Sequence, residues 1–158
     1  MVSIVSKEYW AQKGDCNLFL YRKWSGGAAP PGGNKVLFLI HGSSLSAVPS
    51  YDLKIPGHDD YSVMDYFVRL GFDVWTMDHD GYGRSSRTSS NSDMASSVAD
   101  LKAAFPLVEK ESGCRNAIFF GQSGGSVRAA AFAQACPDKV ERLVLDGFVW
   151  TGKNSPTL

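Results

Sequence analysis

Short apolar runs separated by helical segments are the feature that most constrains the fold of this chain. Val36–Ile40 reads VLFLI, and similar runs follow at Phe72–Met77, at Ala117–Phe120 and from Leu143–Leu145 towards Trp150. Continuous apolar runs bounded by turn residues are typical of strands that are buried on both faces of a parallel sheet.

Helical patterns lie between these runs. We predict helices over Ser62–Leu70 and Asp93–Ser112, and a buried helix over the small residues Ser126–Ala135. Near the N-terminus, the half-apolar runs Glu8–Gln12 and Asn17–Trp24 surround a Gly-Asp step, which predicts a hairpin. Strands that alternate with helices indicate an α/β fold with a mainly parallel sheet flanked by helices.

Composition excludes several classes of protein. The 158 residues suit one domain, and 16 basic and 16 acidic residues leave no net charge. A protein that binds nucleic acid through phosphate contacts would have a basic excess, so no nucleic-acid partner is expected. Three widely spaced cysteines form neither a disulfide framework nor a metal-ligand pattern, and no cofactor or metal is expected. Because neither a signal peptide nor a membrane-spanning run is visible, a cytoplasmic protein without a membrane partner is expected.

One connection is unusually long. About twenty residues separate Ile40 from Ser62, against about two to six in most α/β loops. Long loops after the carboxyl ends of strands are where α/β proteins bind ligands. The Pro, Tyr, Leu and Ile residues of this loop favour a packed surface, with a solvated insertion as the alternative.

The segment Gly121–Gly125, GQSGG, is the strongest chemical signal. It follows the apolar run Ala117–Phe120 directly and precedes the small-residue helix, which is the strand–turn–helix context of a G-x-S-x-G nucleophile turn. The glycines keep bulk away from a sharp chain reversal, and the N-terminus of the helix favours negative charge near the serine. Ser123 is therefore the candidate nucleophile.

Two further motifs agree in position. The run Val36–Ile40 ends in His41-Gly42-Ser43-Ser44, and the next run ends in Asp78-His79-Asp80-Gly81-Tyr82-Gly83-Arg84-Ser85. With these motifs and the GQSGG turn in this order, nearly the whole chain resembles the α/β-hydrolase superfamily, in particular its serine esterases and lipases. The resemblance implies an oxyanion hole formed by the backbone N–H groups of Ser43, with Ser44 as the alternative, and of Gly124.

A nucleophilic serine needs a base and an acid that orients the base. In the family the order along the chain is serine, acid, histidine, but no histidine follows Ser123. His41 is expected to hold the oxyanion loop, His79 to lie two strands from the nucleophile, and His58 to sit in the long loop, so each is a poor base candidate. Asp146, which ends the strand after the nucleophile helix, is the candidate acid, with a loop-bracing role as the alternative.

The resemblance also implies that a part of the fold is missing. Family members carry further strands after the one that corresponds to 143–149, often with a lid between them, whereas this chain stops at Leu158. We interpret residues 1–158 as the N-terminal portion of one α/β-hydrolase domain, with the nucleophile elbow at 121–125 and a lid region starting after about residue 147. The chain is then a fragment, a truncated gene product, or one chain of a two-chain enzyme.

The predicted function is hydrolysis of a small-molecule carboxylic ester through an acyl-enzyme at Ser123. The acid/histidine pair would lie mostly outside this chain, so the isolated chain is expected to be inactive. A serine at this position argues against the family branches that use a carboxylate, the epoxide hydrolases and haloalkane dehalogenases, whereas thioester and C–C bond chemistry stay open. The alternative is a non-catalytic fragment or assembly subunit that pairs through its exposed sheet edge with a second polypeptide or a second copy.

Overall fold

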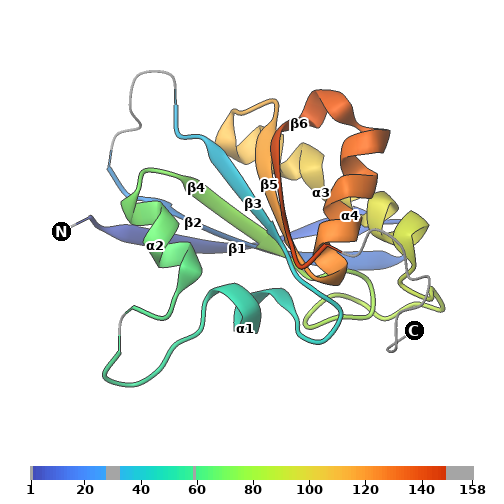
Figure 1. Ribbon diagram of the computed structural model, residues 1–158, viewed down its shortest axis with the longest axis horizontal. Coiled ribbons are helices and arrows are strands. Elements are labelled where there is room, and N and C mark those ends of the chain that lie inside the picture. Colours follow the sequence, from blue (N-terminus) through green and yellow to red (C-terminus); the bar gives the residue numbers. More distant parts are fainter. Residues whose placement is uncertain (1, 28–32, 59, 149–158) are drawn as a thin grey trace.

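A six-stranded mixed sheet with helices on both faces forms the molecule (Figure 1). The computed structural model describes residues 2–27, 33–58 and 60–148. The strands are β1 (Ile4–Lys13), β2 (Cys16–Ser25), β3 (Val36–Ile40), β4 (Asp73–Met77), β5 (Ala117–Gln122) and β6 (Val140–Asp146). The helices are α1 (Ala47–Tyr51), α2 (Val63–Arg69), α3 (Met94–Ser112) and α4 (Gly124–Ala135), with a 3-10 turn at Pro137–Lys139.

The strand order is β1-β2-β4-β3-β5-β6. β3 pairs in parallel with β4 and β5, and β5 pairs in parallel with β6. β1 and β2 form the predicted antiparallel hairpin, and β2 joins the sheet antiparallel to β4. This architecture confirms the predicted α/β fold. β6 starts earlier than predicted, at Val140, and ends at Asp146, so the predicted extension towards Trp150 is wrong for residues 147–148. Residues 149–150 lie outside the described residues.

Alternate residues of the central strands build two separate cores. Phe38, Ile40 and Phe119 point to the face that α3 and α4 cover, whereas Leu37 and Leu39 point to the face that α1 and α2 cover (Figure 1). All five residues of β3 are buried, and so are all five of β4. The continuous apolar run of β3 exists because each of its faces meets a different layer of helices.

The helices agree with their predicted bounds to within a few residues, with two differences. The first residue of α3, Met94, is exposed, and the polar residues Ser97 and Asp100 are buried on the same helix as Leu101 and Phe105. α4 begins two residues early, directly after Ser123, and its last turn is exposed rather than buried.

The long connection after β3 is packed, as expected, but it also contains the short helix α1. Tyr51 of α1 is buried and donates a hydrogen bond to the carbonyl of Ile40 at 2.8 Å. The buried Lys23 ammonium of β2 binds Asp52, which follows α1, at 2.6 Å and Asp65 of α2 at 2.7 Å. These contacts hold the first half of the connection against the sheet. None of the helices in the described parts of the chain is both long and apolar enough to cross a membrane.

Candidate active site

Ser123 lies at the turn between β5 and α4, with φ 54° and ψ −123°. A non-glycine residue with positive φ stores about 1–3 kcal/mol of backbone strain. Hydrogen bonds hold the strained residue from both sides: its N–H donates to the Asp146 carbonyl at 2.8 Å, and its own carbonyl accepts from the N–H and the hydroxyl of Ser126. The Ser123 side chain is left exposed at the carboxyl edge of the sheet.

The spacing of the two outer glycines follows from sterics. A Cβ on Gly121 would lie 2.4 Å from the carbonyl oxygen of Gly125, and a Cβ on Gly125 would lie 2.2 Å from that of Ile40. Both distances are far inside van der Waals contact. The chain can therefore pass from strand to helix at this point only without side chains at these two positions.

The loop after β3 packs directly against this turn. An ideal Cβ on Gly42 would lie 3.3 Å from the Cβ and 3.8 Å from the Oγ of Ser123. A Cβ on Gly124 would lie 3.5 Å from the backbone nitrogen of Ser43. The structure thus brings together the residues of both predicted oxyanion donors. A cavity of about 210 Å³ lies in front of them, lined by Gly42, Ser43, Ser44, Leu45, Ser50, Gln122 and Ser123.

His41 lies buried beneath this loop, and both of its ring nitrogens are engaged. The N–H of His79 donates to Nε2 at 3.3 Å, so Nε2 is unprotonated and Nδ1 carries the hydrogen that it donates to the Gly42 carbonyl at 2.6 Å. Burial, reinforced by the neighbouring His79, lowers the pKa of His41 to about 3. His41 is therefore a neutral imidazole that holds the loop, and neither of its nitrogens is available to Ser123.

His79 follows β4 and is fully buried, two strands away from β5 as expected. Its Nδ1 lies 3.1 Å from Oδ2 of Asp100 on α3. The same oxygen accepts from the Asp80 N–H, and the other carboxylate oxygen, Oδ1, accepts from the Lys13 ammonium. Its Nε2 has no hydrogen-bond partner among the described residues. Burial lowers the pKa of His79, so this imidazole is neutral and enclosed. Asp100 was not among the residues singled out from the sequence, where it is one of the acidic residues of the predicted helix Asp93–Ser112.

His58 is exposed and lies away from Ser123. It lines a different cavity, of about 130 Å³, with Leu53, Lys54, Ser62, Asp65 and Arg69. None of these residues lines the cavity at Ser123. As positioned in the structure, His58 does not approach the turn.

Asp146 ends β6 next to the turn, since its carbonyl accepts the Ser123 N–H. Its carboxylate is exposed and lies near Tyr51; burial and then this negative charge raise the pKa of the Tyr51 hydroxyl. The structure therefore places Asp146 beside the nucleophile turn, and its role as the acid of a triad stays a prediction. In the described parts of the chain, no group of three or more His, Cys, Asp or Glu side chains could hold a metal ion.

Arg128 is the residue of this region that sequence reasoning missed. It lies on α4, is 2% exposed, and donates to the His41 carbonyl at 3.1 Å. The available signal was a single arginine in a helix made otherwise mostly of small and apolar residues.

Comparison with solved structures defines the class of protein. A predicted CIB-like hydrolase from Thermoplasma acidophilum superimposes with a TM-score of 0.66 at 16% identity, over 89% of this chain and 62% of that one. The thioesterase domain of the curacin biosynthetic pathway gives 0.62 at 22% identity, over 88% and 45%. Epoxide hydrolase A from Mycobacterium thermoresistibile gives 0.62 at 23% identity, over 88% and 38%. The fold is that of the α/β-hydrolases, and this chain spans between about two fifths and three fifths of these three structures.

The family follows from the sequence. Residues 60–154 match the family of serine aminopeptidases S33, and the chain belongs to this family of hydrolases. Comparison with curated proteins gives no match.

Proposed function

We propose that this chain carries the nucleophile of a serine hydrolase that acts on a carboxylic ester through an acyl-enzyme at Ser123. One observation carries the proposal. Ser123 is held at positive φ on an exposed strand–helix turn, facing a cavity whose wall contains the backbone of Ser43, and α4 starts at the following residue. The hydrolase family that residues 60–154 match and the α/β-hydrolase fold of the chain support a nucleophilic serine at this turn.

The reaction follows from this arrangement. The Ser123 Oγ attacks the ester carbonyl carbon while its proton passes to a base, and the negative oxygen of the tetrahedral intermediate accepts hydrogen bonds from the Ser43 and Gly124 N–H groups. The C–O bond to the alcohol then breaks, the alcohol leaves with the proton, and water later hydrolyses the acyl-enzyme. The positive end of α4 favours the developing charge.

The base lies outside residues 1–158 in this proposal. His41 is engaged through both nitrogens, His79 is enclosed, and His58 lines another cavity. Asp146 is the candidate acid within the chain, because it ends the strand beside the turn. Esters are favoured over amides because an alkoxide is a better leaving group than an amide anion and therefore needs less assistance from an acid.

Covalent labelling tests the proposal. In an assembly that supplies the base, a fluorophosphonate probe should modify Ser123, which peptide mapping would identify, and Ser123→Ala should abolish the modification. Ser89→Ala, which removes an exposed hydroxyl far from the cavity, is the matched control and should label like the wild type. Labelling that persists in Ser123→Ala would remove this serine from the mechanism.

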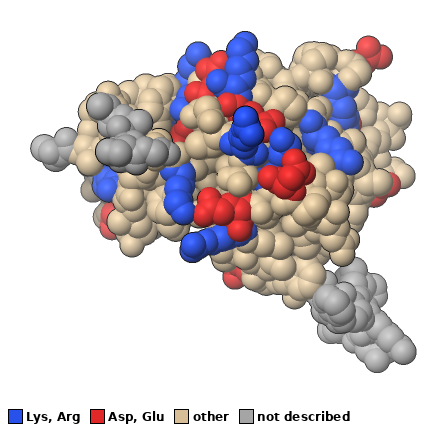
Figure 2. Space-filling view, turned by 90° about the horizontal axis from the view of Figure 1, so that it is seen from above, with Lys and Arg blue, Asp and Glu red and all other residues tan. Residues whose placement is uncertain are grey.

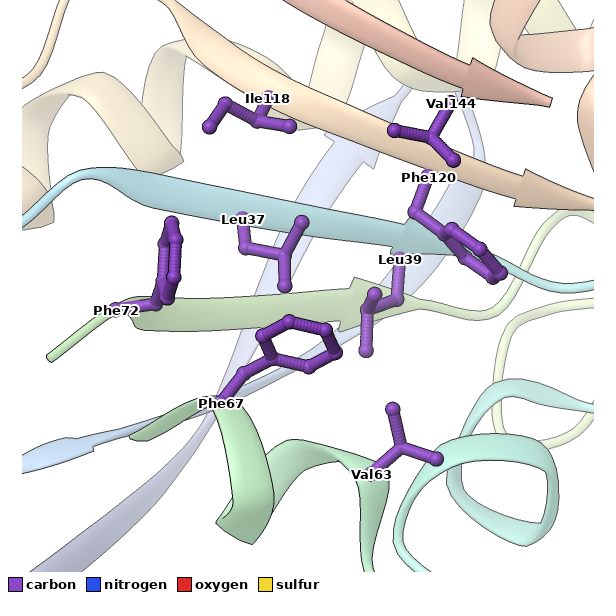
Figure 3. A pocket seen from close by; sticks show the side chains of 8 residues that line it. All are labelled: Leu37, Leu39, Val63, Phe67, Phe72, Ile118, Phe120 and Val144. Carbon is purple, nitrogen blue, oxygen red and sulfur yellow. The ribbon is translucent and has the colours of Figure 1, made fainter. Parts of the chain in front are cut away.

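A second candidate function, assembly, is favoured by the surface next to β6. Within the described residues β6 pairs only with β5, so it forms one edge of the sheet. Beside it lies an apolar groove of about 270 Å³, into which side chains from α2 and from β3, β5 and β6 project (Figure 3). Val144 of β6 lines this groove and is 48% exposed. An open strand edge next to exposed apolar side chains favours pairing with another strand.

We propose a second copy of the chain as the partner, because β6 is complementary to itself. In an antiparallel pair centred on Val144, Leu143 would face Leu145 of the other copy, and Arg142 would face Asp146. Since side chains alternate along a strand, Arg142, Val144 and Asp146 share one face. The pair would join two apolar positions and two opposite charges across the two-fold axis.

Sedimentation velocity tests this pairing. Arg142→Asp should weaken the dimer by placing like charges together, and the double variant Arg142→Asp with Asp146→Arg should restore it. Met94→Lys, which alters a comparably exposed apolar residue on another element, is the control and should leave the dimer intact. A wild type that sediments as a monomer at every concentration would exclude the second copy.

A further inference from the structure

The first three carbonyl groups of the loop after β3 accept hydrogen bonds from side chains. The Gly42 carbonyl accepts from His41 Nδ1 at 2.6 Å and from Arg128 at 3.4 Å. The His41 carbonyl accepts from Arg128 at 3.1 Å, and the Ser43 carbonyl accepts from the Tyr82 hydroxyl at 3.2 Å. Three consecutive carbonyls are thus fixed from below.

Fixing the Gly42 carbonyl also fixes the Ser43 N–H. The peptide unit is planar and trans, so its C=O and N–H point in opposite directions. Because the Gly42 oxygen points towards Arg128 and the His41 ring, the Ser43 hydrogen points the other way, out of the buried layer. The Ser43 nitrogen lies beside Gly124, and Ser43 is one of the residues that line the cavity of Ser123, so an oxyanion in this cavity would form on the side of the Ser43 N–H.

Burial of the Arg128 guanidinium at this position is energetically unfavourable. It is almost fully buried, no carboxylate pairs with it among the described residues, and its Nε lacks a hydrogen-bond partner in the same parts of the chain. A buried cation without a counter-ion strongly destabilises a folded domain. Among the described residues, Arg128 is compensated by the carbonyls, by the Tyr82 hydroxyl at 3.5 Å and by the Tyr82 ring, whose centroid lies 5.1 Å from the guanidinium carbon.

We infer that Arg128 is a positioning residue for the oxyanion loop, with Tyr82 as its second support. The guanidinium holds the His41 and Gly42 carbonyls, orients the Ser43 N–H towards the cavity, and polarises the same peptide unit so that this N–H becomes a stronger donor. This inference rests on the proposed function, since it assigns a support to the oxyanion hole of that reaction.

Inactivation kinetics, measured in an assembly that supplies the base, test the inference. Arg128→Met fills similar space without donors, and we expect kinact for a fluorophosphonate at Ser123 to fall about tenfold, less than the loss on removing an oxyanion donor outright. KI should stay within about twofold, because the probe's other contacts are unchanged. Arg128→Lys should recover a part of kinact, and Tyr82→Phe should show a smaller loss. Arg84→Met, at an exposed arginine that binds Glu8, is the control.

Together, kinact and the final labelling stoichiometry distinguish a positioning role of Arg128 from a loss of folded protein. A variant that only misfolds in part would label to a lower final stoichiometry with an unchanged kinact, and that result would overturn the inference. Equal kinact values for the wild type and Arg128→Met would do the same.

Hydrogen exchange provides a measurement that does not need the chemistry. In Arg128→Met the amides of His79 and Ala47, whose hydrogen bonds to His41 and Asp78 tie down the loop, should exchange about tenfold faster, whereas the amides of β3 should not change. If the wild type is not labelled at Ser123 in that assembly, the proposed function fails, and the exchange data alone then decide whether Arg128 orders the loop. Unchanged exchange at His79 and Ala47 would refute that role. If Arg128→Met does not fold, Tyr82→Phe and Arg128→Lys supply both measurements.

Discussion

Acid should destabilise this protein through His41, at a pH where the buried Asp80 and Asp100 are still ionised. The imidazole is buried as a neutral group whose pKa is lowered from 6.5 to about 3, chiefly by burial. Between these two pKa values the unfolded chain binds a proton that the folded chain does not, so stability is complete above about pH 6.5 and falls as the pH decreases. At about 1.4 kcal/mol per pKa unit, the loss from pH 7.5 to pH 5 is about 2 kcal/mol, or roughly thirtyfold in the folding equilibrium.

At pH 5 the effect of the two buried imidazoles can be separated from the effects of Asp80 and Asp100. The lowered pKa values of Asp80 and Asp100 mean that their stabilising effect is lost only as the pH falls below about 4. The buried His79, whose pKa is also lowered, adds to the loss in the same direction. The contribution of His41 is therefore measured as a difference between variants, not from the wild type alone.

Urea unfolding at pH 7.5 and pH 5, followed by tryptophan fluorescence at one low protein concentration, measures this difference. His41→Asn keeps a donor and an acceptor in the loop but cannot titrate, so it should lose about 2 kcal/mol less than the wild type between the two pH values. His58→Asn removes an exposed imidazole and should follow the wild type. If His41→Asn and the wild type lose the same free energy, His41 is not the acid-sensitive group.

Two further predictions concern buried contacts. Lys23→Met leaves the Asp52 and Asp65 carboxylates without their shared ammonium. The free energy of unfolding, measured by urea titration at pH 7, should therefore fall by about 3–5 kcal/mol. A loss below about 1 kcal/mol would show that Lys54 or solvent compensates for the missing ammonium. Gly125→Ala places a Cβ on the Ile40 carbonyl, so circular dichroism should show a clearly lower Tm, and an unchanged Tm would mean that the turn can open without cost.

The sequence alone determined those parts of the molecule that depend on residues close to one another along the chain. The run Val36–Ile40 predicted a strand buried on both sides, and the structure has that strand with the same bounds. The GQSGG turn could be placed from its glycine spacing and its strand–helix context, and one part of its requirement is local: a Cβ on Gly121 would meet the carbonyl of Gly125, four residues later. The need for Gly125 is not local, because a Cβ there would meet the Ile40 carbonyl of another strand. Hydrophobic period is readable from a single chain because it acts over a few residues.

Only the tertiary structure decided which polar residues are buried together. Arg128 and the carbonyl of His41 are 87 positions apart, and His79 and Asp100 are 21 apart. The small and apolar neighbours of Arg128 on its helix suggest burial but not which groups it contacts, and nothing local distinguishes Asp100 from the other acidic residues of its helix. The short helix α1 was missed for the same reason, because five residues carry no readable period and its Tyr51 is held by the end of β3. A buried charge or imidazole is tolerated only where distant segments supply its partners, and those partners exist only once the sheet order β4-β3-β5 has formed.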